Sequence, residues 1–571
     1  MKPLRPAIGV ALAALLVLAI VAPAQGRPGP SPRSPVTGTW DGVPRSAKPM
    51  PALTPIEDAL TRALERGSLD EATYALERAR TLFDLGEVRD RYGAVTRVDP
   101  RGATMVLRDL VLRLDGLDPA QLRLARAMLA RPTDGAADPF EDGYTVAEAP
   151  PVCSTNGCIH YVASTGDAPP MTDTDGDGIP DYVESARDTF EEVWAAEVTS
   201  YGYRAPKSDL TSDDDGGNGL VDVYVTQLGD QGLYGYCTTD DPNAEPNSGY
   251  RFFDYSAYCV VDDDYAEFPP SSQGLAGLQV TLAHEFFHAI QFAYDAAEDP
   301  WFMESTATWM EDEVYDDIDD NHQYFPRSPL GMPEIPLDYN DGLHVYGAWL
   351  FPRFIAETSP TDPGHVLLRR VWELADAGPT GRDLYGIKAY AVAIKEVLPG
   401  VKFRWVFADF GMRNDAPAAL YEEGADYPSP PPDAIVKVTA RNGGGYGVER
   451  LNHLSNAYVW FRPGRGVQAN AELLVRMDGP AYRTGPEASV VVFFESGKVK
   501  SIPLPLTKQG VAETTVPFGR GKVAQVDLVM TNASTRVQGG ECWVDPDWSY
   551  SCAGFPVDDR TRYAYFGVLQ Q

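Results

Sequence analysis

The sequence is short of basic residues, of paired cysteine motifs and of long apolar runs, and each shortage excludes a class of function. Lysine and arginine number 48 against 82 aspartates and glutamates, a balance that opposes binding to a phosphate backbone. We therefore expect no nucleic-acid partner. The six cysteines include no CxxC pair, which argues against a cysteine-bound zinc site. After residue 21 no apolar run approaches the ~20 residues that a membrane span requires, so we expect no membrane span.

The first residues predict export. A basic start at residues 1–5 precedes an apolar run at residues 7–21, and Ala22-Pro-Ala24 offers a small-x-small cleavage site. We interpret residues 1–24 as a signal peptide and not as a membrane anchor, because the run is short and Gln and Gly follow soon after. The mature chain is therefore expected to be secreted and extracellular.

The cysteines fall into three local pairs. These are Cys153 with Cys158, Cys237 with Cys259, and Cys542 with Cys552. In an exported protein such spacing predicts three disulfides.

Residues 25–145 combine a linker with a small helical unit. Residues 25–50 are rich in Pro, Gly, Ser and Arg, and such a segment cannot bury enough apolar surface to become ordered. Capping boxes that start at Thr54 and Ser68 predict two antiparallel helices. No cluster of catalytic residue types occurs in this region, so we interpret it as a pro-region or a structural N-terminal domain.

The rest of the chain predicts two further domains. Residues 146–427 combine short strands with helices near 182–199 and 275–295, a pattern typical of an α+β fold. The proline-rich residues 428–433 predict a stiff, extended linker. Residues 434–571 contain apolar runs separated by Gly, Pro and Asn, which predict a C-terminal β-sandwich. Contact with a surface or a polymer is a role that we consider for this last domain.

The strongest functional signal is the segment HEFFH at residues 284–288, within an apolar stretch that lacks Gly and Pro. On a helix, His284 and His288 lie one turn apart on one face, so both imidazoles can bind one Zn²⁺. Glu285 is rotated by about 100° toward a metal-bound water, which is where a general base acts. The chain has only seven histidines, so a chance match to HExxH is improbable.

A third zinc ligand is expected sixteen residues further on, at Glu304. Residues 301–311 around it predict a second helix, with apolar residues available for packing and with the small Ala307. A carboxylate here completes a His₂Glu set and leaves one position open for water. Glu311, two turns along the same face, is the alternative ligand, or else a partner that orients a histidine. The sequence leaves both roles open.

This arrangement carries a family resemblance. HExxH followed by a helix of the form WxxExxAxWxE resembles the gluzincin group of zinc peptidases, and roughly residues 50–430 resemble a family of secreted bacterial metalloproteases. The resemblance implies a thermolysin-like two-part catalytic domain with His284, His288 and Glu304 as zinc ligands and Glu285 as the base. The GxMEN segment of gluzincin aminopeptidases is absent from the sequence. We therefore expect an endopeptidase with a protein or peptide substrate.

The developing oxyanion of peptide hydrolysis needs a further hydrogen-bond donor. Residues 343–347 supply two candidates, His344 and Tyr346. Tyr346 is preferred because the resembling gluzincins place a tyrosine downstream. The alternative interpretation of Tyr346 is a buried aromatic residue beside Trp349 and Phe351.

Residues 173–184 match the twelve-residue calcium loop. The expected ligands are the carboxylates of loop positions 1, 3, 5, 9 and 12 and the carbonyl of position 7, namely Asp173, Asp175, Asp177, Asp181, Glu184 and Ile179. Gly178 occupies position 6, where the sharp turn requires glycine. No clear helix precedes the loop, so we expect a structural extracellular Ca²⁺ site. The alternative is an acidic surface loop without metal.

Two other functions compete with a peptidase. The first is a calcium-dependent adhesion or surface-binding protein with an inactive zinc site, against which the presence of Glu285 argues. The second is a non-peptidase zinc hydrolase, which lacks support because no clustered carboxylate and histidine set for two metals is found.

Overall fold

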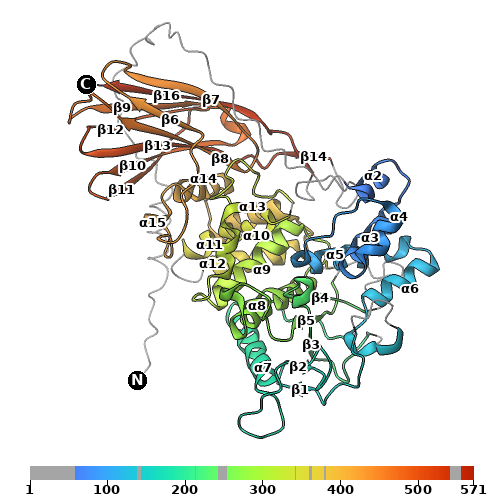
Figure 1. Ribbon diagram of the computed structural model, residues 1–571. Coiled ribbons are helices and arrows are strands. Elements are labelled where there is room, and N and C mark those ends of the chain that lie inside the picture. The colour runs from blue at the N-terminus through green and yellow to red at the C-terminus, as the bar shows by residue number, and fades with distance from the viewer. Residues whose placement is uncertain are drawn as a thin grey trace, which may run out of the picture.

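The computed structural model describes residues 58–137, 143–212, 214–241, 254–340, 342–358, 363–378, 381–539 and 554–570. They form a mixed fold of helices and several β-sheets (Figure 1). The predicted signal peptide, the Thr54 capping box and the Cys542–Cys552 pair lie outside these described residues. Within them, each helix is too short or too polar to cross a bilayer.

Short helices make up the N-terminal unit. They are α2 (Ala59–Glu65), α3 (Glu71–Phe83), α4 (Leu85–Tyr92), α5 (Ala103–Val111) and α6 (Pro119–Met128). The start of α3 differs from the prediction, since Asp70 and not Ser68 caps it and accepts a hydrogen bond from Thr73 N at 2.7 Å. Ser68 instead donates its hydroxyl to Ala63 O at 2.8 Å and so closes the preceding helix.

The hydrophobic core of this unit continues into the rest of the chain. Leu76 of α3 and Leu107 of α5 belong to the same buried cluster as Phe286 and Met303. Arg108, also on α5, donates to Glu298 O at 3.0 Å. The N-terminal helices therefore share a core with the helix that carries the HExxH segment and with the helix after it.

A five-stranded sheet follows. Its strands are β1 (Val152–Cys153), β2 (Gly157–His160), β3 (Val221–Thr226), β4 (Gly235–Thr238) and β5 (Tyr258–Asp262), in the order β1-β2-β3-β5-β4. The three central strands are parallel, and the edge strands β1 and β4 are antiparallel to their neighbours. The disulfide Cys153–Cys158 joins β1 to β2, and Cys237–Cys259 joins β4 to β5, so two of the predicted pairs are confirmed.

The middle of the chain also forms helices, of which the first two pack against this sheet. They are α7 (Asp181–Trp194), α8 (Leu275–Phe292), α9 (Pro300–Val314), α10 (His344–Gly347), α11 (Leu350–Glu357), α12 (Pro363–Ala375), α13 (Gly386–Val397), α14 (Phe403–Asn414) and α15 (Pro417–Leu420). Helix α7 runs on into a π-helical turn at Ala195–Ser200. Helix α8 is buried along almost its whole length, because it packs against β4, β5 and α7 and also against α9.

Two further sheets, of five and four strands, form the C-terminal part (Figure 1). One has the order β11-β10-β13-β8-β6 and consists of Val499–Pro503, Pro486–Phe494, Val523–Asn532, Ser455–Pro463 and Ala434–Val438. The other has the order β12-β9-β16-β7 and consists of Val511–Pro517, Glu472–Asp478, Thr561–Gln570 and Gly444–Leu451. Strands β14 (Val537–Gln538) and β15 (Phe555–Pro556) form a short antiparallel two-stranded sheet. The two larger sheets share one buried cluster, to which Phe461 and Val475 belong.

A buried ion cluster ties the N-terminal part to the five-stranded sheet. The Arg131 side chain is 1% exposed and contacts Asp209 at 2.7 Å and Asp240 at 3.0 Å. It also contacts Asp222 of β3, whose second oxygen lies 3.0 Å from His160 Nε2. Because Arg131 is the cation that the buried Asp209 and Asp222 and the partly buried Asp240 share, their placement depends on it.

We predict that Arg131→Met lowers the free energy of unfolding by about 3–5 kcal/mol, because the substitution leaves two buried carboxylates and one partly buried carboxylate without the guanidinium that they share. The shift of the denaturant midpoint measures this loss. Arg123→Met, at an exposed position of α6, is the control and should change the midpoint little. Equal effects of the two substitutions would contradict the anchoring role of Arg131.

Candidate metal centre

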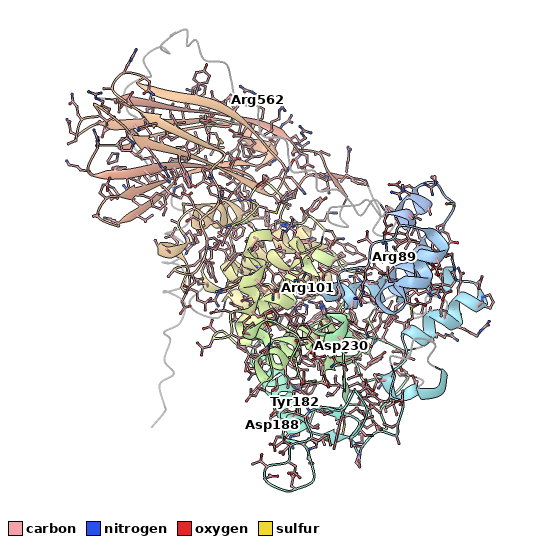
Figure 2. The ribbon with its side chains drawn as sticks, in the orientation of Figure 1. Arg89, Arg101, Tyr182, Asp188, Asp230 and Arg562 are labelled. Carbon is pink, nitrogen blue, oxygen red and sulfur yellow. A yellow bond between two sulfur atoms is a disulfide. The ribbon has the colours of Figure 1, made fainter. Side chains whose placement is uncertain are left out.

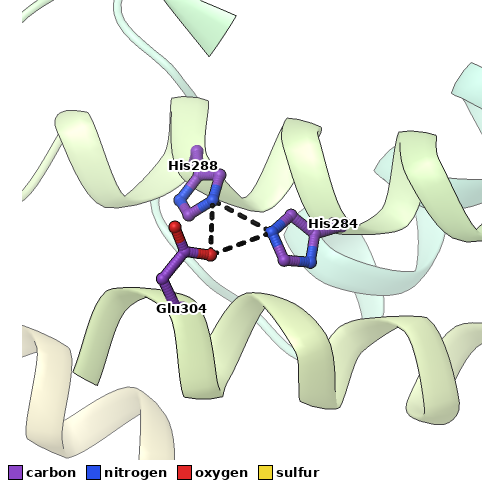
Figure 3. Close-up of side chains that lie close together, drawn as sticks. All are labelled: His284, His288 and Glu304. Atoms are coloured by element: carbon purple, nitrogen blue, oxygen red, sulfur yellow. Dashed lines mark hydrogen bonds and ion pairs between the residues drawn. The ribbon is translucent and has the colours of Figure 1, made fainter. Parts of the chain in front are cut away.

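Helices α8 and α9 bring His284, His288 and Glu304 together (Figure 3). Glu304 Oε2 lies 3.2 Å from His284 Nε2 and 3.5 Å from His288 Nε2, and the two Nε2 atoms are 3.1 Å apart. Ligand atoms about 2.0–2.1 Å from a tetrahedral zinc ion are separated by roughly 3.3–3.4 Å. The three side chains therefore fit a tetrahedral zinc ion.

The second nitrogen of each histidine has its own partner. His284 Nδ1 lies 2.7 Å from Glu311 Oε1, and His288 Nδ1 lies 2.7 Å from Gln291 Oε1. Such contacts fix the ring so that Nε2 faces the metal position. Glu304 thus lies on the Nε2 side of the histidines, and Glu311 lies on the far side of His284.

Gln291 is a residue that the sequence analysis missed. Its amide nitrogen donates to Met303 O at 2.9 Å and to Thr306 Oγ1 at 3.2 Å, and both groups belong to α9. Its position three residues after His288, on the same helical face, is the signal that could have identified it. Gln291 therefore holds the His288 ring and also links the two helices.

The centre stabilises positive charge. Burial alone would lower the pKa of His284, but hydrogen bonds with Glu304 and Glu311 outweigh burial and raise this pKa well above its usual value. Burial alone would raise the pKa of Glu304, yet contacts with His284 and His288 lower it to about 2. Burial raises the pKa of Glu311 to about 7, against the hydrogen bond with His284. A divalent cation supplies the positive charge that this arrangement favours.

Glu285 has a partner from a distant part of the chain. Thr104 of α5 donates its hydroxyl to Glu285 Oε2 at 2.8 Å. The same hydroxyl oxygen accepts a hydrogen bond from Cys237 N of β4 at 2.9 Å. The sequence offered no signal for Thr104, because 181 positions separate it from Glu285. The N-terminal unit therefore contacts the expected base directly.

A narrow pocket of about 40 Å³ opens over His284 and Glu285. This volume suits bound water and is far below the ~300 Å³ of a typical small-molecule pocket. Arg101 lines the pocket and lies where the N-terminal helices meet the central helices (Figure 2). Arg101 also forms an ion pair with Asp99 at 2.8 Å. The wall of this pocket is thus formed in part by the N-terminal unit.

The two candidate oxyanion donors lie in different places. Tyr346 lines the pocket, its ring centre lies 6.0 Å from that of His284, and its buried hydroxyl has no hydrogen-bond partner among the described residues. His344 is absent from the pocket lining, and its ring nitrogens contact Arg327 O at 2.8 Å and Pro336 O at 2.9 Å. The structure therefore brings Tyr346 to the centre and leaves His344 away from it.

The predicted calcium loop brings some of its six ligands together. Asp173, Asp175 and Asp177 each offer a carboxylate oxygen, and these atoms lie within 4.8 Å of one another. Asp181 instead accepts hydrogen bonds from Thr174 N at 2.9 Å and Thr174 Oγ1 at 2.6 Å.

Two further ligands of this loop lie outside that group of three. Glu184 lies 3.5 Å from Arg187, one turn further along α7. Ile179 donates its backbone N–H to Asp177 Oδ1 at 2.8 Å. The structure thus gathers the first half of the loop, whereas the second half belongs to the start of α7.

No protein-family model matches this chain, and no curated protein matches it. It is similar to a solved structure described as a novel family GH115 4-O-methyl-alpha-glucuronidase with specificity for decorated arabinogalactans, at 9% sequence identity and a TM-score of 0.13. The alignment covers 65% of this chain and 54% of the other, so this chain spans about half of that protein. A TM-score this low supports neither a shared fold nor a shared activity.

We predict different zinc losses for the two glutamates of α9. Glu304→Ala should leave less than one zinc per chain, because it removes a ligand-side carboxylate. Glu311→Ala should retain zinc with an affinity weaker by about 10–100-fold, because it removes only the partner of His284 Nδ1. Metal content after dialysis against buffered free zinc measures both effects.

Glu396→Ala, on the partly exposed face of α13, is the control and should bind zinc as the unchanged chain does. If Glu311→Ala loses zinc while Glu304→Ala keeps it, the assignment of the ligand is wrong.

Proposed function

We propose that the protein is a secreted zinc-dependent endopeptidase. The observation that carries this proposal is the spacing of His284 Nε2, His288 Nε2 and Glu304 Oε2, at 3.1 to 3.5 Å, beside the carboxylate of Glu285 in one pocket. Bound there, Zn²⁺ would supply Lewis acidity and lower the pKa of a water molecule toward ~7. The acidic composition and the confirmed disulfides are compatible with a secreted protein.

The side chains of the pocket have separate roles in this proposal. Glu285 takes the proton of the attacking water and then passes it to the leaving amine. Tyr346 donates its hydroxyl to the oxyanion that forms on the peptide carbonyl. Both roles are supported by position, since the two residues line the same pocket and the Tyr346 hydroxyl has no other partner among the described residues.

The finer fold belongs to the same proposal. A thermolysin-like catalytic domain over residues 146–427 is supported by helix α8, which packs on β4 and β5 and presents its histidines toward α9. A β-sandwich over residues 434–571 is supported by the two C-terminal sheets, which share one buried cluster. The edge strand β4 borders the pocket through Gly235, and an extended peptide can bind by pairing with such an edge.

The proposal includes a structural Ca²⁺ ion in the loop of residues 173–184. The grouped carboxylates of Asp173, Asp175 and Asp177 support it, as does the positive φ of 95° at Gly178 in the position that requires glycine. The loop leads directly into α7, which packs against α8. Calcium would therefore stabilise the helix that supports the zinc-binding helix.

We predict that Glu285→Gln abolishes peptide hydrolysis while one zinc per chain remains, because the base is lost and the three ligands stay. Casein hydrolysis and metal content, measured on the same sample, check both parts. Glu373→Gln on α12 is the control and should leave hydrolysis unchanged. Hydrolysis by Glu285→Gln at the rate of the unchanged chain would refute the mechanism.

We predict that millimolar Ca²⁺ raises the melting temperature, because an ion that binds only the folded state stabilises it by about 2.7 kcal/mol at a hundredfold excess over Kd. The double substitution Asp173→Asn with Asp175→Asn should reduce this rise and leave zinc content unchanged. Asp188→Asn, on the exposed face of α7, is the control (Figure 2). If calcium does not change the melting temperature of the unchanged chain, the loop is an acidic turn only.

A further inference from the structure

A second acidic cluster lies at the end of strand β5. Asp262, Asp263 and Asp264 are consecutive, and each offers a carboxylate oxygen within 4.8 Å of the other two. Glu267 adds a fourth carboxylate to the cluster, because its Oε2 and Asp262 Oδ1 both lie close to Gly229. Among the described residues none of these four carboxylates forms an ion pair with lysine or arginine, and Asp262 instead accepts hydrogen bonds from the backbone N–H groups of Leu228, Gly229 and Tyr265. The cluster is therefore a concentration of negative charge without a protein cation.

Asp263 is the unusual member of this cluster. Its side chain is directed inward, since the residue is only 5% exposed, and its Oδ1 has no hydrogen-bond partner among the described residues. Burial, followed by the charges of Asp262, Asp264 and Glu267, raises the pKa of Asp263 to about 7. A buried carboxylate oxygen without a donor costs free energy unless a ligand pairs with it.

We propose that Asp262, Asp263 and Asp264 bind a Ca²⁺ ion. Oxygen ligands at 2.3–2.6 Å from Ca²⁺ lie at most roughly 4.6–5.2 Å apart, which accommodates the spacing of these carboxylates. Mg²⁺ demands a near-ideal octahedron with short bonds of about 2.0–2.1 Å, whereas Ca²⁺ tolerates the irregular geometry that three consecutive residues offer and adds water ligands. Asp264 is only half-buried, so it leaves room for such water.

This site would brace one wall of the zinc pocket. Asp262 Oδ1 accepts hydrogen bonds from Leu228 N at 2.8 Å and Gly229 N at 2.5 Å. Asp262 N and the Tyr265 hydroxyl both donate to Tyr234 O, each at 3.1 Å. Tyr234 lines the pocket beside Gly235 of β4. A cation on this cluster would therefore fix the loop that leads into the edge strand.

The cluster is separate from the predicted calcium loop but is linked to it by one side chain. Tyr182, in the first turn of α7, donates its hydroxyl to Asp262 O at 2.8 Å. The calcium loop ends at this turn. Figure 2 shows Tyr182 and also Asp230, which lies on the loop that Asp262 holds. The chain would then carry two Ca²⁺ sites, one on each side of the Tyr182 contact.

The test uses the full chain and counts bound Ca²⁺ by isothermal titration, together with the melting temperature with and without Ca²⁺. We expect the double substitution Asp263→Asn with Asp264→Asn to remove one equivalent of Ca²⁺. Its melting temperature without Ca²⁺ should be equal to or above that of the unchanged chain, because the repulsion between carboxylates is reduced. Asp262 is left intact because it holds the backbone of the neighbouring loop.

Three further variants separate the possible outcomes. Asp173→Asn with Asp175→Asn should leave the Asp262–Asp264 site filled, and Asp230→Asn, exposed on the same loop, should leave all sites unchanged. Asp264→Asn alone keeps the buried residue and should weaken the same equivalent of Ca²⁺ even if the double variant folds poorly. Full Ca²⁺ stoichiometry in both the single and the double variant would overturn the proposal. Equal binding of Mg²⁺ at this site would overturn the choice of Ca²⁺.

Discussion

The site depends on the cost of burying charge. His284, His288, Glu304 and Glu311 are all at most 7% exposed, in the contact between two helices that are otherwise largely apolar. A charge taken out of water in this way is tolerated only where it is paired and hydrogen-bonded. Glu304 and Glu311 therefore each face an imidazole, and the Nδ1 of each histidine has an acceptor. The ligand geometry follows from this requirement, because few arrangements of two helices satisfy all four groups together.

The same cost explains why cations are expected elsewhere in the chain. The formal net charge is −34, and most acidic side chains lower their free energy by facing water. The carboxylates around Arg131 are buried, and a guanidinium compensates them. Asp263 is buried without such a partner among the described residues, which is why an ion from solution is the reasonable counter-charge there.

Local spacing accounts for what the sequence could predict. The helical period places His284, Glu285 and His288 correctly relative to one another without knowledge of the fold. The strands that become β2, β3, β8, β10 and β13 were recognisable from short apolar runs, and the two local disulfides from cysteine spacing. The choice between Glu304 and Glu311 required the packing of α9 on α8, because both residues lie on the same helical face. His344 could not be separated from Tyr346, because its contacts with the carbonyls of Arg327 and Pro336 depend on the fold and not on local spacing.

The contact between Thr104 and Glu285 joins helix α5 to helix α8 across 181 positions of the sequence. During synthesis Thr104 precedes Glu285 by 181 residues, so this contact can form only after helix α8 has been made. The helices that carry the histidines likewise lack one wall of their pocket until α5 docks. A chain in which α5 has not docked therefore has neither the Thr104 contact to Glu285 nor a complete pocket.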